Sequence, residues 1–338
     1  MNVDPPISVS VVIPVFSGAE YLCDLTQKLE QVKTWLSKND APISIAEVIF
    51  VDDDSSDGSD VILSGLLETH PWVRVIQLTR NFGQHPATAA GILHSSGDWV
   101  CTMDEDLQHK PKDLLSLLQT VTKAGGDVCY AEPSMGTHNA FRDKSSSLTK
   151  KIMSVLSGNK WVTKFHSFRI IRGSIARAAA SVMAHQTYFD VALSWYTNRV
   201  CTVDLAMKDP RIGSSKKSGY PLKRLIEHAG RLFQSLELGI LKTASLLGFV
   251  LMLIAAFVGV SALAIRIWFP EVIALPGWTS VLIMSAFFGG TTAFLVGLVL
   301  NQVVFLSQKM RGRPVFFTVS RQSDLKISNW LDEHRLPK

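Results

Sequence analysis

Residues 99–108 read WVCTMDEDLQ, an apolar run that ends in two carboxylates spaced one residue apart. In an extended chain the side chains of residues i and i+2 point to the same face, so Asp104, Asp106 and Gln108 can converge on one point. Oxygen ligands of this kind suit Mg²⁺ or Mn²⁺, which usually bind together with substrate phosphates. A solvated acidic turn after a strand is the alternative, because Asp is common in turns. The stretch alone leaves the two interpretations equally open.

The chain around this stretch alternates apolar runs with helical patterns. We expect strands at residues 8–15, 46–51, 73–78, 98–103 and 127–131, and helices at 21–36, 61–67, 86–94 and 114–121. This alternation predicts an α/β fold with a mostly parallel sheet and helices on both faces. Ligands of such sheets bind beyond the carboxyl ends of the strands.

Three further polar clusters follow the first three expected strands: IPVFSG at 13–18, VDDDSSDG at 51–58 and TRNFGQH at 79–85. Asp52 and Asp53 suggest a binding role, because successive carboxylates repel one another unless a cation or hydrogen-bond donors lie nearby. For Ser56 and Asp57 we favour a helix N-cap. No GxGxxG or Walker sequence follows the first strand, which disfavours dinucleotide and P-loop binding.

Two long apolar segments, 243–269 and 278–306, contain Arg266 as their only charged residue. Each exceeds the ~20 residues that a membrane-spanning helix needs, with buried helices of a soluble domain as the alternative. The link between them contains two prolines and a glycine, which predicts a hairpin. Lys and Arg flank the hairpin on its outer sides, so we expect both termini in the cytoplasm. A membrane surface also explains the net charge of +5 better than nucleic acid does.

We expect four regions: a catalytic domain at 1–215, an amphipathic interfacial segment at 216–242, two transmembrane helices at 243–306 and a cytoplasmic tail at 307–338. The interfacial segment could instead be a core helix. Small residues recur every four positions in the second span and allow close packing of span on span or of subunits in a homo-oligomer: Ser285, Gly289, Ala293 and Gly297. Four scattered cysteines argue for a reducing compartment and against structural zinc.

Together these motifs resemble the family 2 glycosyltransferases of GT-A fold. The resemblance covers nearly the whole chain and includes RIGSSK at 211–216, the hairpin, and RGRP at 311–314. It is strongest to the branch that acts on polyprenyl phosphates, which includes dolichyl-phosphate mannose synthase and the bacterial undecaprenyl-phosphate sugar transferases. It implies an inverting transfer of a sugar from a nucleotide sugar to a polyprenyl phosphate at the bacterial inner membrane.

The resemblance also implies roles for particular residues. The nucleotide sugar would contact Pro14, Phe16, Asp52, Asp53, Arg80 and Asp104. Asp104, Asp106 and Gln108 would hold Mg²⁺ or Mn²⁺ at the sugar diphosphate, and Asp104, Asp106 and Arg169 would be the catalytic residues. The acceptor phosphate would contact Arg169, Arg211, Ser215 and Lys216, although Arg211 and Lys216 could instead attract the membrane surface.

The chain departs from the family pattern at several of these positions. Gly18 stands where the family commonly has Glu, Glu105 where it has Ala, and Asp54 where it has Gly or Asn. Lys164 and His166 stand in a segment that is commonly acidic. These departures concern the contacts to the donor and the identity of the sugar more than the class of reaction.

Other functions are less consistent with the sequence. A processive polysaccharide synthase would have a QxxRW motif and more spans, and a flipping transporter would need a larger conduit than two spans provide. A glycosyltransferase for another lipid stays open. A non-catalytic membrane scaffold would not need Asp53, Asp104 and Asp106 together.

Overall fold

The computed structural model describes residues 5–133, 164–183, 189–206, 239–269, 277–310 and 323–334, with only part of the side chains in the two long C-terminal helices. The chain divides into two compact units. Residues 5–206 and 323–334, within the described ranges, belong to an α/β unit, and residues 239–310 belong to a helical unit.

The α/β unit is built on a seven-stranded sheet within the described ranges, in the order β3-β2-β1-β4-β6-β5-β7. The strands are β1 (Ile7–Val15), β2 (Ile43–Asp52), β3 (Val73–Gln77), β4 (Trp99–Thr102), β5 (Val128–Pro133), β6 (Arg169–Arg172) and β7 (Val200–Leu205). β6 runs antiparallel to both of its neighbours, and the other pairs are parallel. The predicted mostly parallel sheet is confirmed, and β6 and β7 are additions that the sequence patterns did not reveal.

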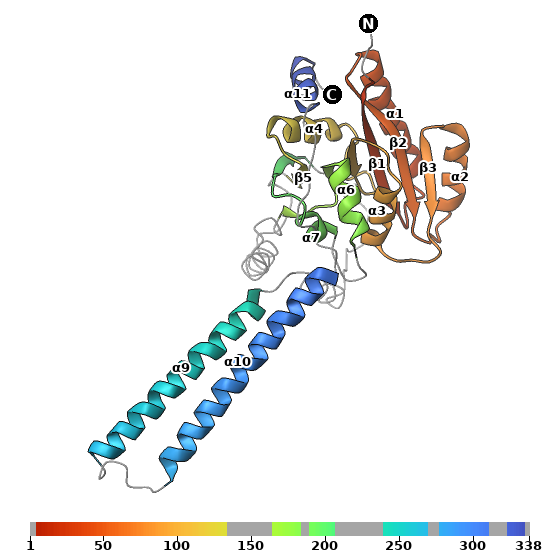
Figure 1. The fold of residues 1–338 in the computed structure, drawn as a ribbon. Helices are drawn as coiled ribbons and strands as arrows, with labels where there is room; N and C mark the ends of the chain where they lie inside the picture. The colour runs from red at the N-terminus through yellow and green to blue at the C-terminus, as the bar shows by residue number, and fades with distance from the viewer. Residues whose placement is uncertain are drawn as a thin grey trace. The chain divides into compact units, whose positions relative to one another are not determined.

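Helices cover both faces of the sheet (Figure 1). One core contains side chains of α1 (Leu22–Lys38), α2 (Ser59–Thr69), α4 (Asp113–Lys123) and α11 (Asp324–Glu333). The other contains side chains of α3 (Gln84–Leu93), α6 (Gly173–Ser181) and α7 (Phe189–Leu193). β1 shows why both faces are apolar: Val11 and Ile13 enter the first core, and Val12 between them enters the second.

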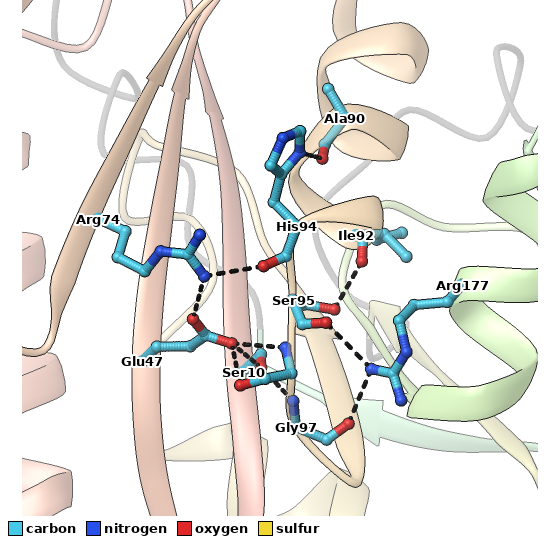
Figure 2. Close-up of polar contacts among 10 residues, drawn as sticks. Ser10, Glu47, Arg74, Ala90, Ile92, His94, Ser95, Gly97 and Arg177 are labelled. Atoms are coloured by element: carbon cyan, nitrogen blue, oxygen red, sulfur yellow. Dashed lines mark hydrogen bonds and ion pairs between the residues drawn. The ribbon is translucent and has the colours of Figure 1, made fainter.

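A buried polar cluster fixes the sheet near the amino ends of its parallel strands (Figure 2). One Glu47 carboxylate oxygen accepts hydrogen bonds from the Ser10 hydroxyl at 2.7 Å and from the backbone N–H of Ser96 at 2.7 Å, and the other accepts from Arg74 at 2.7 Å. Burial raises the pKa of Glu47, but these hydrogen bonds outweigh it and the net pKa lies below the usual value. From α6, Arg177 donates to the Gly97 carbonyl at 3.0 Å, so the turn before β4 is held from both sides.

The helical unit consists of α9 (Gly239–Trp268) and α10 (Trp278–Met310), which lie side by side (Figure 1). The rings of Phe249 and Phe294 lie 5.6 Å apart between them. Gly290 makes the closest approach, because a Cβ there would lie 2.8 Å from the Met252 Cα. Gly289, a member of the predicted small-residue stripe, has nothing within 4 Å of such a Cβ.

α9 and α10 coincide with the two predicted apolar segments, 243–269 and 278–306, and pack against each other. In the part of the chain that the structure describes, no helix combines the length and the apolarity that crossing a membrane requires. The transmembrane placement of the hairpin stays a prediction. The expected interfacial segment lies outside the described residues except for 239–242, which begin α9.

The expected C-terminal tail contains α11, which belongs to the α/β unit and packs on α4. Ile327 and Leu331 are fully buried in the first core, and the rings of Trp330 and Trp35 meet edge to face at 5.7 Å. The Asp324 carboxylate accepts a hydrogen bond at 2.7 Å from Arg172, at the end of β6. The last helix of the chain thus completes the core of the sheet.

This packing predicts that Ile327→Ala lowers the free energy of unfolding of the α/β unit by about 2–5 kcal/mol, because it removes buried methyl and methylene groups. Leu325→Ala is the matched control on the same helix, since Leu325 is 76% exposed, and it should change stability by no more than about 0.5 kcal/mol. Thermal unfolding followed by tryptophan fluorescence measures both. Equal shifts of the two melting temperatures would contradict the docking of α11.

Candidate active site

The carboxyl ends of four parallel strands form the edge at which the predicted site residues gather. The backbone N–H of Asp53 donates to the Val15 carbonyl at 2.8 Å, and that of Met103 donates to Val12 at 3.2 Å. The first residues after β2 and β4 are therefore tied to the carboxyl half of β1 at this edge. Ligands of parallel sheets bind at such edges.

Asp53 holds the loop that follows β3. Its carboxylate oxygens accept hydrogen bonds from the backbone N–H groups of Phe82 at 2.7 Å and Gly83 at 2.8 Å. The neighbouring Asp52 accepts from the Ser55 N–H at 2.9 Å. Both aspartates are buried, so backbone donors explain how adjacent carboxylates are tolerated here.

Glu105 holds the loop that follows β1. Its two carboxylate oxygens accept hydrogen bonds from the backbone N–H groups of Phe16 at 3.0 Å and Ser17 at 3.1 Å. A Cβ added to Gly18 would lie 2.4 Å from one of these oxygens, so the departures from the family pattern at 18 and 105 are direct neighbours. Burial raises the pKa of Glu105 to about 6.

Asp57 makes a third contact of this type. Its carboxylate accepts hydrogen bonds from the N–H of Ala19 at 3.0 Å and from the N–H of Ser59, the first residue of α2, at 3.1 Å. The N-cap of α2 is Gly58, so the cap that we expected at Ser56 or Asp57 is not formed. Asp57 instead satisfies the N–H of Ser59 from outside the helix and also fixes the loop after β1.

Asp104 is surrounded by uncharged hydrogen-bond donors. Its side chain accepts from Gln84 Nε2 at 2.6 Å and from the Ser167 hydroxyl at 2.7 Å. Its backbone N–H donates to His109 Nδ1 at 3.1 Å, which requires a neutral ring nitrogen, and burial lowers the pKa of His109 to about 4. Burial also raises the pKa of Asp104, an effect that a bound cation would reverse.

The turn after Asp104 brings Asp106 and Gln108 together, although not through the extended geometry on which the i, i+2 prediction rested, because β4 ends at Thr102. Asp106 accepts hydrogen bonds from the Gln108 backbone N–H at 3.2 Å and from its side-chain amide at 2.9 Å. Leu107 between them has a φ of 60°, a left-handed conformation that is uncommon for a non-glycine residue and makes the turn tight.

The oxygen atoms of Asp104, Asp106 and Gln108 match the hard ligands that Mg²⁺ and Mn²⁺ prefer. Within the described residues no group of three or more His, Cys, Asp or Glu side chains is placed to hold a metal ion. Two carboxylates with one amide therefore fit a cation whose shell is completed by oxygens of a substrate, as is usual for Mg²⁺ with phosphates.

Arg169 does not face an open site. It lies in β6, is 3% exposed, and its guanidinium forms an ion pair with Asp190. Tyr130 donates to the same carboxylate at 2.8 Å, and the Phe189 ring lies 4.8 Å from the guanidinium. Arg211, Ser215 and Lys216, which we expected beside it at the acceptor, lie outside the described residues.

Two exposed aromatic side chains border the edge: Phe16 is 48% and Phe82 is 45% exposed. The Arg80 guanidinium lies over the Phe82 ring at 4.6 Å, and Pro14 is partly buried at the end of β1. Large exposed apolar groups on a loop held by Asp53 or Glu105 are suited to stacking on a planar ligand.

Sequence reasoning missed the roles of Gln84, Ser167 and His109 in positioning Asp104. They lie 20, 63 and 5 residues away from it, and only Gln84 belongs to one of the polar clusters that follow the expected strands. Glu105 was visible only as a departure from the family pattern. No periodicity or spacing links any of them to Asp104.

Comparisons with known proteins identify the family. Residues 10–178 match the model of glycosyl transferase family 2. The chain is 25% identical to an undecaprenyl-phosphate 4-deoxy-4-formamido-L-arabinose transferase of Photorhabdus laumondii, over 96% of this chain and 98% of that protein. It is 28% identical to the protein of the same name from Serratia proteamaculans, over 94% of each chain.

Solved structures show a weaker likeness. Glucosyl-3-phosphoglycerate synthase from Mycobacterium tuberculosis, in complex with Mn²⁺, UDP-glucose and phosphoglyceric acid, is 15% identical with a TM-score of 0.44 over 68% of this chain and 78% of that chain. The mannosyltransferase PcManGT from Pyrobaculum calidifontis, in complex with GDP-mannose and Mn²⁺, is 14% identical with a TM-score of 0.42 over 98% and 88%. The match to the family model, which spans the sheet from β1 to α6 and both Asp104 and Asp106, is the one that decides: the chain belongs to glycosyl transferase family 2.

Proposed function

We propose that the protein transfers a sugar from a nucleotide sugar to a polyprenyl phosphate, such as undecaprenyl phosphate, with inversion at the anomeric carbon. Family membership and full-length relatives named as undecaprenyl-phosphate transferases support this function. The observation that supports it most directly is the contact of Asp106 with Gln108 in the loop after β4, at the edge where the loops after β1 and β2 also begin.

The acceptor needs little activation by the protein. The second pKa of a phosphate monoester is about 6, so it is mostly dianionic at neutral pH. A phosphate oxygen attacks the anomeric carbon and forms the new C–O bond, while the bond to the nucleoside diphosphate breaks and its electron pair leaves with that diphosphate. Attack from the side opposite the leaving group inverts the anomeric centre. No dedicated general base is required.

The donor would bind across the loops that Asp53 and Glu105 hold. The nucleoside would contact the side chains of Pro14, Phe16 and Arg80. Asp52 and Asp53 would line the same part of the site beneath them. The ion Mg²⁺ or Mn²⁺ would be held by the carboxylates of Asp104 and Asp106 and by the side-chain amide oxygen of Gln108. When bound, such an ion neutralises the charge that develops on the diphosphate leaving group.

The acceptor phosphate would meet cations from the segment before the hairpin, Arg211 and Lys216, with the Ser215 hydroxyl. We propose a different part for Arg169. Its guanidinium stays in the core with Asp190, and its positive charge lowers the pKa of Asp104, against the larger effect of burial. Arg169 would thus favour the ionised form of Asp104 rather than touch the acceptor.

We also propose that the hairpin places the protein in the bacterial inner membrane, with the catalytic unit and both termini on the cytoplasmic side. The large apolar side chains that α9 and α10 leave exposed support contact with lipid, among them Phe257 at 74% and Val281 at 66%. The Lys and Arg residues that flank the hairpin support the orientation. Oligomerisation through the exposed part of the small-residue stripe would be compatible with this arrangement.

The function is tested with membranes that contain the full chain, undecaprenyl phosphate and a panel of radiolabelled UDP- and GDP-sugars. We expect label in the lipid extract with at least one donor, in a product that mild acid cleaves as a glycosyl phosphate. Membranes that lack the protein are the control. The absence of labelled lipid across the panel would contradict the proposal.

Asp106→Ala is expected to reduce transfer by about 10²- to 10³-fold, because it removes stabilisation of charge that forms on the leaving group. EDTA should have a similar effect on the wild type, and added Mn²⁺ should restore the activity. Asp98→Ala, which alters a carboxylate at the opposite end of β1 and β4, is the control. Full activity of the wild type in EDTA would contradict the metal role.

Asp190→Ala is expected to lower the free energy of unfolding by about 3–5 kcal/mol, because it leaves the buried Arg169 guanidinium without a counterion. Asp204→Ala, at an exposed position of β7, should have little effect. Thermal unfolding of both variants gives the comparison. A small effect of Asp190→Ala would show that Arg169 is free to turn toward an acceptor.

A further inference from the structure

Glu105 connects two loops that are far apart in sequence. It lies between Asp104 and Asp106 in the loop after β4, yet its carboxylate reaches the backbone of Phe16 and Ser17 in the loop after β1. The exposed Phe16 ring and the two aspartates are therefore joined through a single side chain. Any displacement of that carboxylate would release the loop that carries Phe16.

Gly18 makes room for this contact. A Cβ at position 18 would lie 2.4 Å from a Glu105 carboxylate oxygen and 2.8 Å from its Cδ, which is closer than real Cβ contacts allow. The Gly18 carbonyl accepts hydrogen bonds from Tyr21 at 2.8 Å and Leu22 at 3.2 Å and so begins α1. The backbone at 18 is fixed by the helix, so an added methyl group would push the flexible Glu105 carboxylate aside.

Glu105 is unsuited to bind a cation itself. Both of its oxygens accept backbone N–H groups, which present the positive end of their dipoles where a cation would have to sit. Asp106 and Asp57 add negative charge around it, and within the described residues no Lys, Arg or His forms an ion pair with it. The Glu105 carboxylate is held in place by two backbone N–H donors. Hydrogen bonds to a charged acceptor are stronger than those between neutral groups.

We propose that Glu105 is a positioning residue that couples the nucleoside end of the donor site to its diphosphate end, and that Gly18 is needed to accommodate it. Contact of a nucleoside with the loop after β1 then favours the arrangement of Asp104 and Asp106 that receives the diphosphate, and the reverse holds by linkage. The coupling rests on the proposed function, whereas the contact between Glu105 and the loop does not.

The contact is tested first without any ligand. Hydrogen exchange of the full chain, followed by mass spectrometry of a peptide that covers residues 13–19, reports on the N–H groups of Phe16 and Ser17. Glu105→Ala and Gly18→Ala should both accelerate this exchange. Glu105→Gln, which keeps one acceptor oxygen on the loop after β4, should give an intermediate rate. Asp98→Ala, which removes a carboxylate that accepts the Ser8 N–H at 2.9 Å at the other end of the sheet, should leave it unchanged.

The coupling is tested with Mn²⁺ titrations followed by electron paramagnetic resonance, with and without UDP or GDP. In the wild type and in Asp98→Ala, one of the two nucleotides should raise the affinity for Mn²⁺ by about tenfold or more. In Glu105→Ala and Gly18→Ala the nucleotide should no longer change the affinity for Mn²⁺, and Glu105→Gln, which keeps one acceptor oxygen, should retain part of the enhancement.

The outcomes separate the two ideas. Wild-type protein whose Mn²⁺ affinity responds to neither nucleotide would overturn the proposed donor site and, with it, the coupling, while the exchange data would still decide whether Glu105 holds the loop. A Glu105→Ala variant with wild-type exchange, or with full nucleotide enhancement of Mn²⁺ binding, would overturn the role of Glu105. An intermediate result for Glu105→Gln, with Asp98→Ala unchanged, would exclude a general loss of folding as the cause.

Discussion

The arrangement of the catalytic edge depends on one kind of interaction, in which a carboxylate from one loop accepts backbone N–H groups of another. Asp53 binds the loop after β3, Glu105 binds the loop after β1, and Asp57 joins that loop to the start of α2. Loops at the end of a parallel sheet have backbone donors with no strand partner, and a partly buried donor must be satisfied. An ionised acceptor does so with hydrogen bonds that are stronger than those between neutral groups.

Many acidic residues lie at this edge, but most of them bind backbone N–H groups, so few remain as candidate metal ligands. Asp53 and Glu105 each have both oxygens occupied by N–H groups, whereas the donors to Asp104 and Asp106 are neutral side chains and one local backbone group. Amide and hydroxyl donors can reorient when a cation arrives, but a backbone N–H cannot move without its loop. The carboxylates of Asp53 and Glu105 therefore fix the shape of the site. Those of Asp104 and Asp106 can change partners, and they are the pair suited to a metal and a diphosphate.

Much of the fold follows from local patterns in the sequence, and much of the site does not. The alternation of apolar runs correctly predicts β1 to β5 and α1 to α4, because a parallel sheet covered on both faces needs apolar side chains on both sides of each strand. The contact between Asp106 and Gln108 is also local, but it comes from a turn with a left-handed Leu107 rather than from the expected extended geometry. Other features depend on contacts between segments that are distant in sequence. These are the ion pair of Arg169 with Asp190, the hydrogen bond from Ser167 to Asp104, and the packing of α11 on α4. Arg169 shows the limit most clearly: the resemblance to the family implied a phosphate ligand, yet its environment in the sheet already supplies a carboxylate.

The topology also constrains how the α/β unit is completed. The helical unit is inserted in sequence between β7 and α11, and α11 supplies Ile327 and Leu331 to the core together with a carboxylate for Arg172. Until the last ~15 residues of the chain have been made, one face of the sheet beside α4 lacks its cover, and Arg172 lacks one of its two carboxylate partners, the other being Asp127. A chain cut after the hairpin would retain Asp104, Asp106 and Glu105 but would expose apolar surface on the first core. Burial of apolar area is the main stabilising term for a sheet of this kind. The core that supports the catalytic edge is therefore completed only after the chain has passed through the helical unit and returned as α11.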